Sequence, residues 1–326
     1  MIRRVLVATA ALVAAVFSIG PVSDRLARRL MAAPRRLPEE AGMAVLLDRL
    51  GGEVVRLRSR DGIRLTGRWL AAEVADDGWQ ADPREAILLL HGYSGSVTPD
   101  LVELGPFLRR TAGVLGLDFR GHGGSDDAPT TFGLDEVEDV AGALAWLGER
   151  GVRRVALVGS SMGGITAIAA TAVLGDGRLP AADLDPDAPV ATVGAPRPRI
   201  VAVIADSASP ELALVVGRRL GLRGGVRLAG QAFSRFPRIV GGDPRSTQPI
   251  AMVPMLEDVP LLLVHGGADR LIPRKAAARL AAATPQGTRH LVVAGAGHGE
   301  PHAKDPEAWE AAASDLLRTA FATARD

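Results

Sequence analysis

Residues 155–164 read Val-Ala-Leu-Val-Gly-Ser-Ser-Met-Gly-Gly, and this stretch decides the fold that we expect. An apolar, strand-like run ends at Val158, the motif Gly159-Ser160-Ser161-Met162-Gly163 follows, and helical periodicity continues to Leu174. A serine on such a sharp strand-to-helix turn needs glycines two positions before and after it, because larger side chains would clash. The turn lifts the hydroxyl above the sheet, beside the positive end of the helix. We therefore predict Ser161 as a nucleophile.

The motif alone is weak support for that prediction. The chain contains 38 glycines, and chance alone gives roughly 0.2 matches to the five-residue pattern in a chain so rich in glycine. Its place between an apolar strand and a helix strengthens it, since that is the context in which such a serine becomes reactive. The other parts of a catalytic site are therefore needed to support it.

The composition excludes several classes of protein. The 326 residues are 47% hydrophobic and 23% charged, which is typical of a globular chain. The net charge of +1 gives no reason to expect a nucleic-acid partner. The absence of cysteine excludes disulfides, thiolate catalysis and cysteine-containing zinc sites. We expect neither a cofactor nor a metal.

The N-terminus differs from the rest of the chain. Arg3 and Arg4 precede an uncharged apolar run, residues 5–22, and five more arginines follow by position 36. About 18 residues is near the lower limit for spanning a bilayer. We interpret residues 1–36 as an apolar anchor or signal segment, with a buried core helix as the alternative. The chain would then be membrane-associated through residues 5–22, or exported; no small-x-small cleavage site follows the run, which favours an uncleaved anchor.

The remaining chain, residues 37–326, has the pattern of an α/β domain. Asp61-Gly62 lies between two strand-like runs and predicts an opening hairpin. Unbroken apolar runs, typical of strands buried on both faces, then occur at residues 86–90, 113–119, 154–158, 200–205, 260–264 and 289–294. A short helical stretch precedes the hairpin at residues 43–50, and helical periodicity occurs at residues 135–148, 162–174, 208–220, 274–283 and 306–322. This alternation predicts a doubly wound, mostly parallel sheet.

Two segments interrupt the alternation. Residues 175–199 are rich in proline, aspartate and glycine, and we expect a surface loop there. Residues 221–254 carry five arginines among apolar residues, which favours a small cap inserted into the domain.

Three further elements supply the parts that an acyl-transfer site needs. The loop His91-Gly92-Tyr93-Ser94-Gly95 follows the first buried run. A tetrahedral intermediate needs two N–H donors, and we assign these to Tyr93 and Met162. Asp269 and His298 each follow a later apolar run, so both are expected at the sheet edge where ligands bind. His298 would take the proton of Ser161, and Asp269 would fix the His298 tautomer.

Alternatives exist for the acid and the base. Asp206 also ends an apolar run and is the alternative acid, while His302 is the alternative base. His298 and His302, with Glu300 and Asp305 nearby, could also form a metal site. That site is disfavoured, because no helix places two histidines on one face in the usual metalloprotease manner.

With these elements in the order Ser161, Asp269, His298, the chain resembles the α/β-hydrolase superfamily from about Glu53 to Ala322. Residues 118–125, Asp-Phe-Arg-Gly-His-Gly-Gly-Ser, resemble the loop after that fold's fourth strand. Together with Asp206-Ser207 they are most similar to the BEM46-like group of single-domain, membrane-associated serine hydrolases. The long segment at residues 175–199 departs from the family pattern.

The resemblance implies a serine hydrolase, esterase- or lipase-like, that cleaves a small-molecule acyl substrate through an acyl-enzyme. A serine peptidase, a thioesterase or an acyltransferase would use the same residues, so these alternatives stay open. So does a cofactor-free haloperoxidase or lyase. A different class of function is a non-catalytic membrane-surface binding protein, in which the arginine-rich segment and the N-terminal run bind anionic lipid.

Overall fold

The structure, a computed structural model, describes residues 20–35, 40–175 and 197–324. Most of the predicted anchor and most of the predicted surface loop therefore lie outside the described residues. Among the residues that are described, no helix combines the length and the apolar character needed to cross a membrane.

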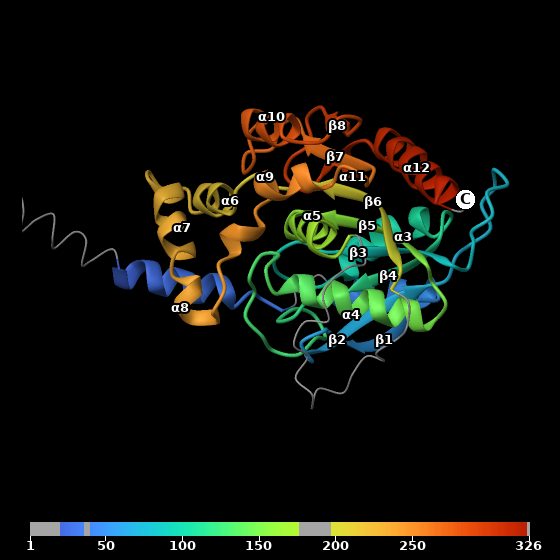
Figure 1. Cartoon of the computed structure of the whole chain (residues 1–326), viewed down its shortest axis with the longest axis horizontal. Coiled ribbons are helices and arrows are strands. Elements are labelled where there is room, and N and C mark those ends of the chain that lie inside the picture. Colours follow the sequence, from blue (N-terminus) through green and yellow to red (C-terminus); the bar gives the residue numbers. More distant parts are fainter. Residues whose placement is uncertain (1–19, 36–39, 176–196, 325–326) are drawn as a thin grey trace, which may run out of the picture.

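The fold is built on an eight-stranded sheet with helices on both faces (Figure 1). The strands are β1 (Glu53–Arg58), β2 (Arg64–Leu70), β3 (Glu85–Leu90), β4 (Gly113–Leu117), β5 (Arg154–Ser160), β6 (Arg199–Asp206), β7 (Leu261–Gly266) and β8 (Arg289–Val293). Their order in the sheet is β1-β2-β4-β3-β5-β6-β7-β8. β2 pairs antiparallel with β1 and β4, and the pairs from β4 to β8 are parallel. The predicted opening hairpin and the predicted doubly wound, mostly parallel sheet are confirmed.

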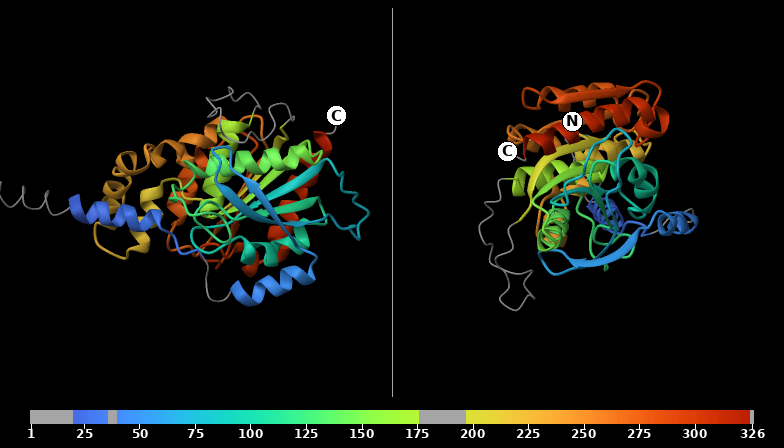
Figure 2. Two further views of the ribbon diagram at one scale, coloured as in Figure 1. Left: turned by 90° about the horizontal axis from the view of Figure 1, so that it is seen from below. Right: turned by 90° about the vertical axis from the view of Figure 1, so that its right-hand side faces the viewer.

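The central strands are apolar throughout because both of their faces are covered. In β3, Ala86, Leu88 and Leu90 contribute to one hydrophobic cluster, while Ile87 and Leu89 contribute to another on the opposite face. The first cluster includes residues of α4 (Glu136–Glu149), α5 (Met162–Leu174) and α10 (Arg274–Ala282). The second includes residues of α2 (Glu40–Arg49), α3 (Thr98–Leu108) and α12 (Pro306–Thr323). This two-sided burial places the helices in two layers around the sheet (Figure 2).

One helix of the core was not predicted. α3 lies between β3 and β4, and its sequence includes Gly105 and Pro106, which obscure its helical pattern. Pro106 removes one backbone hydrogen bond near the end of the helix, and Leu101, Leu104 and Leu108 are buried at helical spacing. The sequence signal for α3 was therefore present but was masked by residues that normally end helices.

A group of short helices lies beyond the carboxyl ends of the strands. It consists of α6 (Leu212–Arg219), α7 (Gly225–Phe233), α8 (Phe236–Val240), a 3-10 turn η1 (Pro244–Thr247), α9 (Pro249–Met252) and a second turn η2 (Val253–Met255). Residues 221–254, the predicted cap, thus fold as helices. The helix formed by residues 20–31 lies beside α7 and α8 (Figure 1), and an Asp24–Arg235 ion pair of 3.4 Å joins it to the group.

Candidate active site

The turn between β5 and α5 holds Ser161 in an unusual backbone conformation. Ser161 has φ 51° and ψ −109°, outside the regions that side-chain-bearing residues normally adopt. A Cβ at Gly159 would lie 2.3 Å from the carbonyl of Gly163, and one at Gly163 would lie 2.0 Å from the carbonyl oxygen of Leu90. Both glycines are therefore required for the turn to pass this close to the neighbouring backbone. The Ser161 N–H donates to the Asp206 carbonyl at 2.8 Å, which fixes the turn to β6.

Three predicted side chains from distant parts of the chain meet at the carboxyl edge of the sheet. Ser161 Oγ lies 2.9 Å from His298 Nε2, and His298 Nδ1 lies 2.8 Å from Asp269 Oδ2. Asp269 follows β7, and His298 follows β8. The two distances are those of hydrogen bonds, so the hydroxyl, the imidazole and the carboxylate form a continuous chain.

Asp269 is held as an anion that points at the histidine. Its side chain is fully buried, and its Oδ1 accepts hydrogen bonds from the N–H groups of Leu271 and Ile272 at 2.7 and 2.8 Å. Burial raises the pKa of this carboxyl, but the hydrogen bonds from His298 and from the backbone outweigh it and lower the pKa below its usual value. The carboxylate can therefore accept only from a protonated Nδ1, which leaves Nε2 of neutral His298 free to accept the Ser161 proton.

The loop that carries Tyr93 runs beside Ser161. A Cβ built on Gly92 would lie 3.6 Å from the Cβ of Ser161. Met162 is the first residue of α5, so its N–H has no acceptor within the helix. The two predicted oxyanion donors therefore come from the loop after β3 and from the first turn of α5, both next to Ser161.

Histidines of the surrounding loops hold this region in place. His91 Nε2 accepts from the Phe119 N–H at 3.1 Å, and His122 Nε2 accepts from the Ser94 N–H at 3.3 Å. Burial, with a smaller contribution from His122, lowers the pKa of His91 to about 3, so the imidazole stays neutral and can act as an acceptor. Asp118 accepts from the N–H groups of Val97 and Gly124, which agrees with a role in organising the loops.

The segment before residue 37 packs onto these same loops. The Leu30 carbonyl accepts from the Tyr93 hydroxyl at 3.1 Å. The Pro34 carbonyl accepts from Gly95 N–H at 2.8 Å, and the Arg35 carbonyl accepts from Gly123 N–H at 2.8 Å. Residues 30–35, which the sequence assigns to an N-terminal anchor or signal segment, thus contact the loop that carries the predicted oxyanion donor.

A small apolar cavity opens beside Ser161. It has a volume of about 120 Å³ and is lined mainly by apolar side chains, with Ser161, His298, Arg219 and Tyr93 as its members that carry polar groups. Its walls come from three sources, namely Leu30 of the N-terminal helix, Val215 and Val216 of α6, and Phe132 with Ile165 of the domain itself. The sequence does not distinguish these five apolar lining residues, because their apolar character is that of any core residue.

The side chains of the alternative acid and of the alternative base are hydrogen-bonded to other groups. Asp206 accepts from the Trp309 indole N–H and from the Ser207 hydroxyl, both at 2.9 Å. His302 Nδ1 lies 2.8 Å from Glu103, and its Nε2 lies 3.2 Å from Glu310. Within the described parts of the chain no cluster of histidine and acidic residues is arranged to hold a metal.

Ser207 is a contributor to the site whose role the sequence did not reveal. It has a left-handed backbone with φ 52°, and its hydroxyl accepts from the Gly299 N–H at 3.0 Å while it donates to Asp206. This connection holds the residue that follows His298 against the end of β6. The Asp206-Ser207 pair of the resemblance was the only sequence signal for it.

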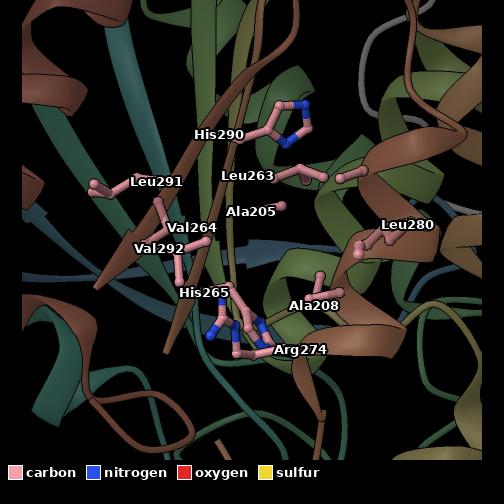
Figure 3. A pocket seen from close by; sticks show the side chains of 13 residues that line it. Ala205, Ala208, Leu263, Val264, His265, Arg274, Leu280, His290, Leu291 and Val292 are labelled. Carbon is pink, nitrogen blue, oxygen red and sulfur yellow. The ribbon is translucent and has the colours of Figure 1, made fainter. Parts of the chain in front are cut away.

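A second cavity, of about 260 Å³, lies between α10 and the strands β7 and β8 (Figure 3). Leu263 and His265 of β7, His290 and Val292 of β8, and Arg274 and Leu280 of α10 are among its lining residues. It contains none of the five predicted site residues. The cavity beside Ser161 is therefore the candidate active site.

Comparison with known proteins supports this description of the fold. Residues 87–313 match the model of the alpha/beta hydrolase family. The uncharacterized protein MT2364 of Mycobacterium tuberculosis is 30% identical over 284 residues, which cover 85% of this chain and 82% of that protein. A Pyrococcus furiosus esterase, Pf2001, superposes with a TM-score of 0.61 at 22% identity, covering 89% of this chain and 98% of the esterase. A bacterial membrane phospholipase A superposes with a TM-score of 0.58 at 17% identity, covering 98% of this chain and 99% of its own. The chain therefore belongs to the alpha/beta hydrolase family and is a hydrolase of that fold.

Proposed function

We propose that the chain is a serine hydrolase that cleaves a carboxylic ester through an acyl-enzyme intermediate. The observation that carries the proposal is the chain of hydrogen bonds from Ser161 Oγ through His298 to Asp269, which ends at an apolar cavity. An esterase and a phospholipase are among the solved structures that share the fold, which is in keeping with this chemistry.

The reaction follows from the protonation states of the three side chains. His298 Nε2 removes the Ser161 proton as the oxygen attacks the ester carbonyl, and the N–H groups of Tyr93 and Met162 stabilise the oxyanion. The imidazolium then donates its proton to the departing alcohol, while the Asp269 carboxylate stabilises its positive charge. Water, activated by His298 in the same way, releases the acid and restores Ser161.

The size and the lining of the cavity indicate which acyl group the substrate carries. Its volume of about 120 Å³ is well below the range of about 300–1,000 Å³ that is usual for pockets that hold drug-sized ligands. Its lining beside Ser161 and His298 is aliphatic and aromatic apart from Arg219 at one side. A short, uncharged acyl chain therefore fits best, and the alcohol part of the ester would lie outside the cavity.

Two measurements test the proposal. A serine-reactive fluorophosphonate should label the wild-type chain and should not label Ser161→Ala. Chromogenic esters of increasing acyl length should then show the highest kcat/KM for short chains, with Ser161→Ala at least 10³-fold slower on all of them. The matched control is Ser160→Ala, which changes the adjacent serine of the same turn and should keep both labelling and turnover. Labelling that survives in folded Ser161→Ala would refute the proposal.

A further inference from the structure

The helix formed by residues 20–31 presents two different faces. Ser23, Ala27 and Met31 are buried against the domain, and Leu26 and Leu30 are half-buried on the same side. Val22, Arg25, Arg28 and Arg29 recur at helical spacing on the opposite side, and all four are exposed. The outward face of this helix is therefore basic, with an apolar residue at its beginning.

The cap helices beside it continue the same surface. Their exposed arginines are Arg218 and Arg219 at the end of α6, Arg223 in the following turn, Arg227 in α7 and Arg238 in α8. Leu222 and Val226 are exposed between them, with 62% and 40% of their surface accessible. Arg235 joins the cap to the N-terminal helix through Asp24, so the two elements lie side by side (Figure 1). We call the outward face of residues 20–31 and 212–240 the arginine face.

The charge of the arginine face is unlike that of the whole chain. Its two segments contain nine arginines and a single acidic residue, Asp24, whereas the chain as a whole has a net charge of +1. The remainder of the chain is therefore net negative. Among the ion pairs of the described residues, Arg235 is the one arginine of this face that pairs with a carboxylate. Arginines without a carboxylate partner, gathered in two neighbouring segments of a nearly neutral chain, produce a local positive potential.

The helices that carry the arginine face also line the candidate active site. Leu30, Val215, Val216 and Leu220 line the cavity from the inner side of the same helices. Arg219 lines the cavity too and is exposed, so the cavity reaches the surface next to α6. A partner bound to the arginine face would therefore lie against the route by which substrate reaches Ser161.

We propose that the arginine face is a docking surface for anionic phospholipid bilayers, and that it places the cavity entrance against the membrane. Arginines attract anionic headgroups, and the exposed Val22, Leu222 and Val226 would enter the boundary between headgroups and acyl chains. The exposed apolar residues favour a bilayer over a nucleic acid as the partner. A surface that binds a nucleic-acid backbone contacts phosphates and sugars and needs only basic and polar side chains. The inference extends the proposed function, because it supplies membrane-dissolved esters to the Ser161 site.

The test compares vesicle binding by the full chain and by two variants. The first replaces Arg25, Arg28, Arg223, Arg227 and Arg238 with glutamine, and leaves out Arg29 and Arg219 because they lie near Tyr93 or the cavity. The second is the matched control and replaces five other exposed arginines with glutamine, namely Arg49, Arg56, Arg110, Arg153 and Arg199. Arg110, Arg153 and Arg199 precede or begin β4, β5 and β6, at the edge of the sheet opposite the cavity.

Vesicles of phosphatidylcholine alone, or of phosphatidylcholine and phosphatidylglycerol in equal parts, serve as the probe. An arginine near an anionic surface contributes about fivefold to binding, so we expect the arginine-face variant to bind the anionic vesicles at least tenfold more weakly. The control variant should bind like wild type. The preference for anionic vesicles should fall with added salt, since screening shortens the reach of these charges. Equal binding by the arginine-face variant and wild type would overturn the proposal, as would a wild type that does not discriminate between the two vesicles.

Hydrolysis gives a second readout that also verifies folding. A soluble butyrate ester should be cleaved by the arginine-face variant within about twofold of the wild-type rate, because none of the five residues lines the cavity. A butyrate ester of a long-chain alcohol, dissolved in anionic vesicles, should be cleaved at least tenfold more slowly. If the arginine-face variant with its five substitutions does not fold, the double variant Arg223→Gln/Arg227→Gln takes its place, with the same readouts. Ser161→Ala separates the two proposals, since it should abolish both hydrolyses and leave vesicle binding unchanged.

Discussion

The substitution Asp269→Asn isolates the role of the buried carboxylate. The geometry determines how the new amide lies. The N–H groups of Leu271 and Ile272 both donate to Oδ1, so the amide oxygen must occupy that position and the amide NH2 must face His298. The NH2 group is a donor, and it would require His298 Nδ1 to act as an acceptor. Neutral His298 would then carry its proton on Nε2 and could not accept the proton of Ser161.

The expected loss follows from this change of tautomer. Placing the wrong tautomer beside a nucleophilic serine costs about 10⁴-fold in kcat, which corresponds to about 5.4 kcal/mol of transition-state stabilisation. The KM for a soluble ester should change little, because Asp269 does not line the cavity. Folding should be affected only modestly, because the amide oxygen keeps both backbone hydrogen bonds.

The measurement is the rate of hydrolysis of a short chromogenic ester, together with the thermal midpoint of unfolding. Asp206→Asn is the matched control, since Asp206 is also a buried carboxylate at a strand end but pairs with Trp309 and Ser207. We expect kcat to fall less than tenfold in that variant. Folded Asp269→Asn that retains kcat within tenfold of wild type would refute the reasoning, and a larger loss in Asp206→Asn would assign the acid to β6 instead.

Three further predictions concern the turn, the buried histidine and the cavity. Gly163→Ala should destabilise the fold by about 3 kcal/mol or more, since the new Cβ would lie 2.0 Å from the Leu90 carbonyl oxygen. In the control Gly230→Ala the new Cβ would lie 3.9 Å from its nearest neighbour outside the helix backbone, so its stability should stay close to that of wild type. Chemical denaturation measures the free energy of unfolding of both variants. The pKa of His91 falls to about 3 on folding, so its contribution to stability is complete above the unfolded pKa and is lost as the pH falls toward 3. Between pH 7 and pH 4.5 the loss should be about 2–3 kcal/mol, and urea titrations of His91→Gln should show a shallower pH dependence. Val216→Phe should shift the preferred ester toward shorter acyl chains in a chain-length series. The control is Val173→Phe, at an exposed position, which should leave the preference unchanged. An unchanged preference in Val216→Phe would show that the cavity does not hold the acyl group.

The contacts of the N-terminal segment connect two parts of the protein that the sequence treats separately. Leu30 of helix 20–31 lines the cavity. The backbone carbonyl of Leu30 accepts a hydrogen bond from the hydroxyl of Tyr93, which lies on the predicted oxyanion loop. Its opposite face carries exposed arginines. A segment that reads as an anchor or signal thus also contributes to the candidate active site, so its removal should alter the cavity as well as any attachment to a membrane.

The sequence by itself determined the parts of this protein that depend on neighbouring residues. The alternation of apolar runs and helical segments indicated the sheet and most of its helices, because a strand buried on both faces is an unbroken run of apolar residues. The glycines around Ser161 indicated the strained turn, since no other residue leaves room for it. The pattern missed α3, where Gly105 and Pro106 interrupt the helical signal, although the packing of Leu101, Leu104 and Leu108 holds the helix together.

Tertiary structure alone decided which groups meet. Asp206 and Asp269 both end apolar runs in the sequence, and only the fold places Asp269 within 2.8 Å of His298 and turns Asp206 toward Trp309. The strand order, the packing of residues 20–35 on the loops beside Ser161 and the cavity between α6 and the domain likewise join residues far apart in the chain. Hydrogen bonds and cavities depend on distances between such residues, and those distances are fixed only when the whole core has packed.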